Sequence, residues 1–454
     1  MDGRLSFGGH VKAILRIGIP LIGSHLAQMA IGVTDTLMLG WYDVTTLAAS
    51  VIGSSLFFVI FIFGAGIGNA VMPMVAQANA SGETTQVRRV TRMGMWLAVI
   101  FGVLVLPIFV WSAPLLLGMG QEPVVADLAQ TYLRIAGPGI LPAILVTVLR
   151  GFLSGLERTT VLFVATVAAA VLNAIVNYAL IFGNWGFPEL GIAGAAIASV
   201  TTHALTFVVL LVYIRRVLPE HSLFLRLWKP DWEVFFRVQN MAVLIGLTML
   251  AEVGLFAASS VIVGWTGTLN LAAHGIAIQV TSVTFMVHLG LSGVATIRAG
   301  SHYGRRDVVA LRDGGLAIMV LSLGYSVITA ILFVWIPEPM TGLFLSPDDP
   351  AREEIIAIAS LLLLFGAVFQ LADGAQAAAI GLLRGIQDVR VPMVMAALSY
   401  WAVGIPVALV LSTWFELGAP GVWMGLIAGL TCAGILLNFR FWRDLSKTVR
   451  YRDG

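Results

Sequence analysis

The stretch MAVLIGLTMLAEVGLFAASSVIVGW, residues 241–265, is long and apolar enough to cross a lipid bilayer as a single helix. A bilayer core of about 30 Å needs about 20 apolar residues of helix. This run has 25 residues, and its only charged residue, Glu252, is the twelfth. The stretch therefore predicts a membrane helix that holds a carboxylate near mid-membrane.

The composition of the whole chain indicates a polytopic membrane protein. Its 454 residues are 59% hydrophobic and 11% charged, whereas a soluble domain has about 25% charged residues. A single cysteine, Cys432, excludes an internal disulfide and a multi-cysteine metal site. The first apolar run, Ile17–Gly40, is too long for a cleaved signal peptide, so we interpret it as the first membrane helix.

Hydropathy predicts an all-α polytopic membrane protein with twelve transmembrane helices. The apolar runs cover roughly residues 15–40, 47–76, 93–114, 125–150, 160–183, 191–214, 238–265, 270–297, 315–336, 354–383, 392–414 and 420–441. Short segments rich in glycine, proline and charge separate them.

The distribution of positive charge predicts the orientation of these helices. If the N-terminus is cytoplasmic, the inner segments hold 24 of the 26 lysines and arginines, and only Arg134 and Arg352 lie outside. Cytoplasmic loops are the ones that carry an excess of lysine and arginine. The pattern therefore predicts an even number of helices and two cytoplasmic termini.

An internal repeat divides the chain. LAASVIGSS begins at Leu47 and LAAHGIAIQ begins 224 residues later, whereas GFLSGLERTTV begins at Gly151 and GLLRGIQDVRVP begins 230 residues later. The repeat predicts two halves, residues 1–225 and 226–454, with six helices each. Because six is even, both halves start on the same side, so we expect a pseudo-twofold axis along the membrane normal and a central cleft between the two bundles.

Three acids lie within the apolar runs: Asp35, Glu252 and Asp373. A charge at the bilayer centre costs at least about 2.5–3.5 kcal/mol, so such residues face a cavity or a partner. Glu252 and Asp373 each lie about 16 Å from the predicted inner end of their helix, whereas Asp35 is nearer the outer side. Two buried carboxylates at one depth can share a proton or bind a hard cation such as Na⁺. Alternatively, each acid only fixes helix packing through hydrogen bonds.

The acids are not symmetric in the repeat, which favours an ion-handling role for the second half. The positions equivalent to Glu252, Asp35 and Asp373 are Gln28, Ser259 and Ala143. A purely architectural role would tend to recur in both halves.

Other polar residues within the runs are candidates for the lining of the cleft. Asn173 and Asn177 are four residues apart, so they share one helical face. The remaining candidates are Gln28, His25, Gln279 and Tyr400. Hydrogen bonds between neighbouring helices are the alternative role for all of them.

Five stretches, in order, resemble the multidrug and toxic compound extrusion (MATE) family, and within it the NorM-type branch. They are GIPLIGSHLAQMAIGVTDTLMLG with Asp35, VLNAIVNYALIFG with PELGIAGAAIAS, AEVGLFAASS with Glu252, LADGAQAAAIGLLRGIQDVRVP with Asp373, and LSYWAVGIPVALVL with Tyr400. The resemblance covers essentially the whole chain.

The resemblance implies a secondary active multidrug efflux antiporter that exports organic, mostly cationic compounds in exchange for Na⁺ or H⁺. It implies that Glu252 and Asp373 bind the coupling ion, which they would ligate through their carboxylates if it is Na⁺, and that Asp35 contributes to ion or substrate handling. We expect no other cofactor, no nucleic-acid partner and a functional monomer. The expected location is the bacterial inner (plasma) membrane, and the expected phenotype is antibiotic resistance.

Two other functions find little support in the sequence. A lipid-linked precursor flippase of the same superfamily would need arginines within the membrane for an anionic headgroup, and none lies in the middle of a run. An intramembrane enzyme would need an aligned nucleophile and base. For Ser292 in GLSG, the candidate base His288 lies on the same predicted helix and not on a neighbouring one. The sequence also has no HExxH or P-loop motif, so we do not expect the protein to be an enzyme.

Overall fold

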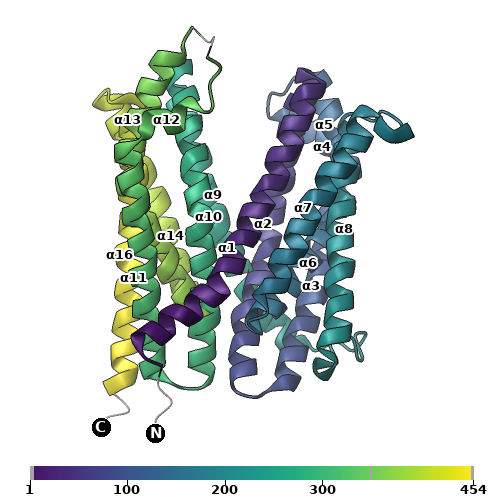
Figure 1. Cartoon of the computed structure of the whole chain (residues 1–454), viewed down its shortest axis with the longest axis vertical. Helices are drawn as coiled ribbons and strands as arrows, with labels where there is room; N and C mark the ends of the chain where they lie inside the picture. The colour runs from purple at the N-terminus through teal and green to yellow at the C-terminus, as the bar shows by residue number, and fades with distance from the viewer. Residues whose placement is uncertain (1–4, 348–349, 451–454) are drawn as a thin grey trace. The chain divides into compact units, whose positions relative to one another are not determined.

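The computed structural model describes residues 5–347 and 350–450, and this part of the chain is helical without strands. The α-helices are α1 (Phe7–Tyr42), α2 (Val44–Ala80), α3 (Thr84–Val110), α4 (Ser112–Gly118), α5 (Pro123–Ala136), α6 (Ile140–Gly155), α7 (Thr159–Phe182), α8 (Ile192–Val217), α9 (Trp232–Gly264), α10 (Thr268–Gly304), α11 (Val308–Trp335), α12 (Pro337–Gly342), α13 (Arg352–Gly385), α14 (Arg390–Leu398), α15 (Ile405–Leu409) and α16 (Gly418–Arg450) (Figure 1). Short 3₁₀ segments are η1 (Gly137–Gly139), η2 (Asn184–Gly186) and η3 (Pro219–His221), and π-helical segments are η4 (Ser399–Gly404) and η5 (Val410–Trp414).

The twelve predicted membrane helices are confirmed. In the described residues, twelve helical segments are long and apolar enough to span a bilayer, and each contains most of one predicted run. Several helices extend beyond the apolar run. For example, α3 begins at Thr84 and α9 at Trp232, ahead of the predicted 93 and 238. These extensions carry arginines, which favour helix but not lipid, so hydropathy leaves them out.

Two of the spans are interrupted within their length by a change of helical winding. The fourth span consists of α5, η1 and α6, with Gly137-Pro138-Gly139 at the break. The eleventh consists of α14, η4, α15 and η5, and Pro406 is the second residue after the first π-helical segment. Proline has no N–H to donate, so the helix around it loses a backbone hydrogen bond and adopts a different winding.

The described helices form two compact units. One unit comprises residues 23–246, and the other comprises residues 5–22 with 247–450. The divisions fall inside α1 and α9 and not in the linker at residue 225. The division into residues 1–225 and 226–454 describes the sequence repeat, and it stays a prediction about that repeat.

Glycines at repeat-related positions let helices pack closely in each unit. In the first unit, a Cβ added to Gly155 of α6 would lie 2.9 Å from the carbonyl oxygen of Met72 on α2. In the second unit, a Cβ added to Gly385 of α13 would lie 2.7 Å from the carbonyl oxygen of Thr296 on α10. The two glycines are 230 residues apart, the offset of the repeat. Small residues at such crossings allow backbones to approach in lipid.

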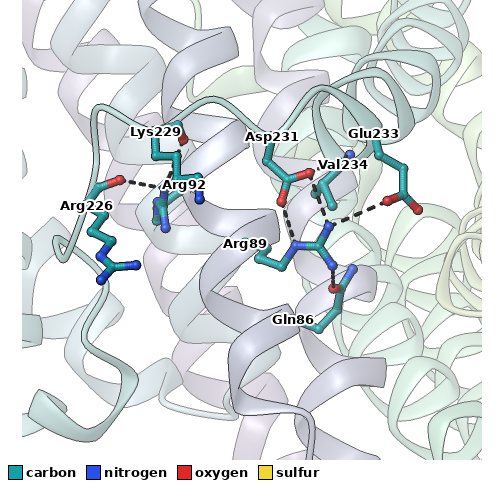
Figure 2. A network of polar contacts seen from close by, with 8 residues as sticks. All are labelled: Gln86, Arg89, Arg92, Arg226, Lys229, Asp231, Glu233 and Val234. Carbon is teal, nitrogen blue, oxygen red and sulfur yellow. Dashed lines mark hydrogen bonds and ion pairs between the residues drawn. The ribbon is translucent and has the colours of Figure 1, made fainter.

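Hydrogen bonds attach the segment of residues 226–231, which precedes α9, to α3; we call these contacts the α3 clasp (Figure 2). Arg92 donates to the backbone carbonyl oxygens of Arg226 and Lys229 at 2.6 and 3.0 Å. Arg89 forms two hydrogen bonds to the Asp231 carboxylate, at 2.5 and 3.2 Å. The Arg92 hydrogen bonds pair two backbone carbonyl oxygens that lie outside any regular helix. Together with the Arg89 contacts, they hold the start of α9 against α3.

Acid should weaken this clasp. The Arg89 hydrogen bond holds the pKa of Asp231 below its usual value. A lowered folded-state pKa stabilises at neutral pH, and that stability is lost as the pH falls below about 4 towards the folded-state pKa. Both side chains are partly exposed, so the expected contribution is at most about 1 kcal/mol. Asp231→Asn should lower the thermal unfolding midpoint in detergent at pH 7, and the difference from the wild type should be smaller near pH 3. An equal difference at both pH values would contradict this account.

Candidate functional site: two buried acidic clusters

Glu252 and Asp373 lie in the same unit, on α9 and α13. The two carboxylates are close enough for their charges to interact. Arg384 and Tyr400 are also close enough to interact with the charge of Glu252. Asp373 is buried, with 1% of its surface exposed. The structure thus brings together both acids that the sequence placed at one depth, and it adds Arg384, which lies on α13 like Asp373.

The Asp373 cluster has oxygen atoms without a hydrogen bond. Asp373 Oδ2 and Gln376 Oε1 are buried and have no hydrogen-bond partner. The amide nitrogen of Gln376 donates to the hydroxyl oxygen of Tyr400 at 2.6 Å. Tyr400 is fully buried and belongs to the π-helical segment η4, a winding that is frequent at functional sites. A buried oxygen without a donor is costly, so these atoms are ready ligands for a proton or a cation.

A second polar network fixes α13 beside Asp373, and sequence reasoning missed it. His288 of α10 lies 3.2 Å from Ser322 Oγ of α11 and 3.2 Å from Gln370 Oε1 of α13. Ser322 also donates to the carbonyl oxygen of Gly374 at 2.9 Å. The sequence feature that could have indicated this network is His288 inside an apolar run, because a histidine within a membrane helix needs hydrogen-bond partners.

Asp35 has its own cluster in the unit of residues 23–246. Asn177 of α7 donates to Asp35 Oδ1 at 2.5 Å, and Ser199 of α8 donates to Asp35 Oδ2 at 3.4 Å. Asn177 also donates to Asn173 Oδ1 at 3.1 Å. The two asparagines share one face, as predicted from their spacing, and that face meets Asp35. No cationic side chain of the described residues lies within ion-pair distance of Asp35.

The other cleft candidates are not all near the acids. Gln28 accepts a hydrogen bond from Arg150 of α6 at 2.7 Å, and His25 lies close enough to feel the charge of Arg150. Arg150 lies in the last turns of α6, which ends at Gly155. Gln279 is part-buried on α10, and no hydrogen bond of its side chain is found among the described residues.

The donor set fits a hard cation or a proton and not a transition metal. Among residues 5–347 and 350–450, no three or more His, Cys, Asp or Glu side chains gather in a metal-binding group. Glu252, Asp373, Gln376 and Tyr400 offer only oxygen atoms that could act as ligands. Na⁺ is a hard cation, for which carboxylate, carbonyl and water oxygens are suitable ligands. The assignment of Na⁺ to Glu252 and Asp373 stays a prediction.

Comparison with known proteins gives the family. The family model described as MatE matches residues 20–179 and 245–410, more than half of the chain. A "Probable multidrug resistance protein NorM" of Rhizobium meliloti (strain 1021) is 44% identical over 97% of this chain and 95% of its own length. One of the same name from Agrobacterium fabrum is 43% identical over the same shares.

A solved structure shares the fold. The outward-facing conformation of a multidrug resistance MATE family transporter matches 97% of both chains with a TM-score of 0.88 at 19% identity. At that identity the likeness shows the fold alone, with twelve spans in two lobes. The assignment to a family rests on the family model and on the relatives named NorM. This chain therefore belongs to the MATE family, in its NorM-type branch, and is an integral membrane transporter and not an enzyme.

Proposed function

We propose that this protein is a secondary antiporter that exports organic, mostly cationic compounds in exchange for Na⁺ or H⁺. The observation that carries the proposal is the Asp373 carboxylate, buried beside Glu252 with one oxygen unpaired. The names of the relatives, which describe probable multidrug resistance proteins, agree with it.

The physical reason is the cost of two negative charges within interaction range of each other, one of them fully buried. Two carboxylates in a water-poor site repel each other, and a bound proton or cation removes that repulsion. If the ion binds one conformation of the transporter more tightly than another, its gradient biases the conformational cycle. Export of a compound can then be coupled to entry of the ion.

The test uses proteoliposomes loaded with a fluorescent organic cation. Either a Na⁺ gradient or a pH gradient is imposed, and dye movement is recorded. We expect one of the two gradients to drive dye movement, which would identify the coupling ion. Liposomes without protein, and proteoliposomes whose gradient has been collapsed, are the controls. Dye that moves equally with and without a gradient would contradict antiport.

We further propose that the protein lies in the bacterial plasma membrane with both termini in the cytoplasm. The bias of 24 of 26 lysines and arginines carries this orientation. Labelling of single cysteines in the α2–α3 turn and in the α1–α2 turn tests it, after Cys432 has been replaced. A membrane-impermeant thiol reagent applied to whole cells should modify only the α1–α2 turn, and the reverse pattern would overturn the orientation.

A further inference from the structure

Arg92 of the α3 clasp is a buried guanidinium with an unused donor. Its side chain is 8% exposed, and its two hydrogen bonds in the clasp both run from Nη2 to backbone carbonyl oxygens. Its Nε is buried and has no hydrogen-bond partner. In the part of the chain that the structure describes, no carboxylate lies within ion-pair distance of Arg92. A buried N–H without an acceptor is costly, so an anion that supplied an oxygen here would be stabilised.

Further cations lie around Arg92. Arg88 and Arg226 are close enough for their charges to repel that of Arg92. Asp231 is also within this range, but its carboxylate already accepts two hydrogen bonds from Arg89. Arg226 is exposed, and Figure 2 shows its guanidinium extending away from the carbonyl oxygen that Arg92 binds. The cluster therefore carries more positive than negative charge, and a bound anion would reduce the repulsion.

The cluster lies where α3 enters its apolar run. Arg92 directly precedes the run predicted at residues 93–114. One turn further along α3, Trp96 donates from Nε1 to the carbonyl oxygen of Leu227 at 2.8 Å. The residues on either side of Leu227 are therefore held at the level where the apolar run begins. That level corresponds to the membrane interface, where tryptophan is enriched and where basic residues meet lipid headgroups.

Exposed apolar side chains lie beside these cations. Trp228 is 76% exposed, and Leu225 and Trp232 are exposed as well. Trp228 lies directly between Leu227 and Lys229, two residues whose carbonyl oxygens are bound by α3. A phospholipid would meet both kinds of group at once, with its phosphate at the cations and its acyl chains at the apolar side chains. Inorganic phosphate would meet only the cations.

We propose that the α3 clasp and residues 225–229 form a binding site for the headgroup of one anionic phospholipid. Arg92 Nε and the exposed side chains of Arg226 and Lys229 donate to the phosphate, and Trp228 packs against the glycerol and the first part of the acyl chains. Arginine suits this role because its planar guanidinium matches phosphate oxygens in two-bond geometry. The site is independent of the coupling ion and of the exported compound, since none of its residues belongs to the Asp373 cluster or the Asp35 cluster.

The test is native mass spectrometry of the purified full-length protein in a neutral detergent. The protein is titrated with phosphatidylglycerol, which is anionic, with phosphatidylcholine, which has no net charge, and with inorganic phosphate. Each cation near a membrane surface strengthens binding of anionic lipid about fivefold, so the first phosphatidylglycerol should bind at least about 10-fold tighter than phosphatidylcholine. Inorganic phosphate should bind more weakly than phosphatidylglycerol, because it cannot contact Trp228.

A double variant assigns this preference to the linker. The clasp uses the backbone carbonyl oxygens of Arg226 and Lys229, so Arg226→Gln with Lys229→Gln leaves the hydrogen bonds from Arg92 in place. Loss of the two cations should weaken phosphatidylglycerol binding about 25-fold and leave phosphatidylcholine binding unchanged. Arg158→Gln with Arg216→Gln is the matched control, because both residues are exposed in the same unit and their loss changes the net charge equally. It should bind like the wild type.

Several results would overturn the site. Phosphatidylglycerol binding that is equal in the wild type and the linker variant would do so, and equal weakening by the control pair would mean that net charge alone attracts the lipid. A wild type that binds phosphatidylcholine as tightly as phosphatidylglycerol also contradicts the proposal, whether or not the variants fold. Inorganic phosphate that binds as tightly as phosphatidylglycerol would assign the cluster to a free anion. A lower thermal midpoint in the linker variant, with loss of both lipids, would mean that the two side chains only support the fold.

Discussion

Replacing Asp373 with asparagine is expected to abolish ion-driven transport while leaving the protein at least as stable as the wild type. The side chain is 1% exposed and one of its oxygens has no hydrogen bond. The amide keeps the volume but can hold neither a proton nor, with comparable strength, a cation. Coupling free energies between sites correspond to about 5–150-fold effects, so we expect gradient-driven dye transport to fall about 100-fold.

Stability separates this loss of function from a folding defect. Removing an uncompensated buried charge relieves a desolvation cost, so the thermal midpoint of Asp373→Asn should equal or exceed that of the wild type. Glu252→Gln should behave in the same way. Glu354→Gln is the matched control, because Glu354 is an exposed acid on the same helix. Normal transport by Asp373→Asn would show that the acid is structural, and a lower midpoint would point to a packing role.

Adding even one methyl group at Gly385 is expected to destabilise the crossing of α13 with α10. An added Cβ would lie 2.5 Å from the Cβ of Ala299 and 2.7 Å from the carbonyl oxygen of Thr296. The second contact is with backbone, which no rotamer change relieves. Overpacking of this kind costs about 1–3 kcal/mol for Gly385→Ala and more for valine. The measurement is the thermal unfolding midpoint in detergent, followed by size-exclusion chromatography.

A second glycine provides the control with the opposite sign. Gly275 lies on α10 and has no atom within 4 Å of an added Cβ. Alanine there should be neutral or stabilising by up to about 1 kcal/mol, because glycine is a poor helix former. If Gly275→Ala and Gly385→Ala lowered the midpoint equally, close packing at Gly385 would not be the cause.

The spans could be predicted from sequence because hydropathy measures the transfer of side chains into lipid. All twelve runs coincide with observed helices. The helix ends could not be predicted equally well, since α3 and α9 begin ahead of their apolar runs with segments that carry arginine and contribute little apolar signal. The contact units could not be predicted either. They divide within α1 and α9, where the sequence has no break in its pattern.

The candidate sites were predictable in part, where one helical period links the residues. Asn173 and Asn177 share a face by spacing alone, and the structure adds their contact with Asp35. The partners of Arg150 were not predictable, because Gln28 and Ser24 are more than 100 residues away in the chain. A charge count assigns an arginine near the end of a run to the membrane surface and says nothing of the side chains that it contacts.

The π-helical segment η4 constrains how this gene can gain or lose codons. A π-helical turn accommodates one more residue than an α-helical turn, so the span from Arg390 to Trp414 tolerates a residue that a regular helix would have no room for. Deleting one codon between Ser399 and Gly404 would return this turn to regular α-helix and would change the position of Tyr400 in it. The hydroxyl would then lose Gln376. A hydropathy analysis would not detect such a deletion, although it would remove the hydrogen bond between Gln376 and Tyr400 from the candidate site.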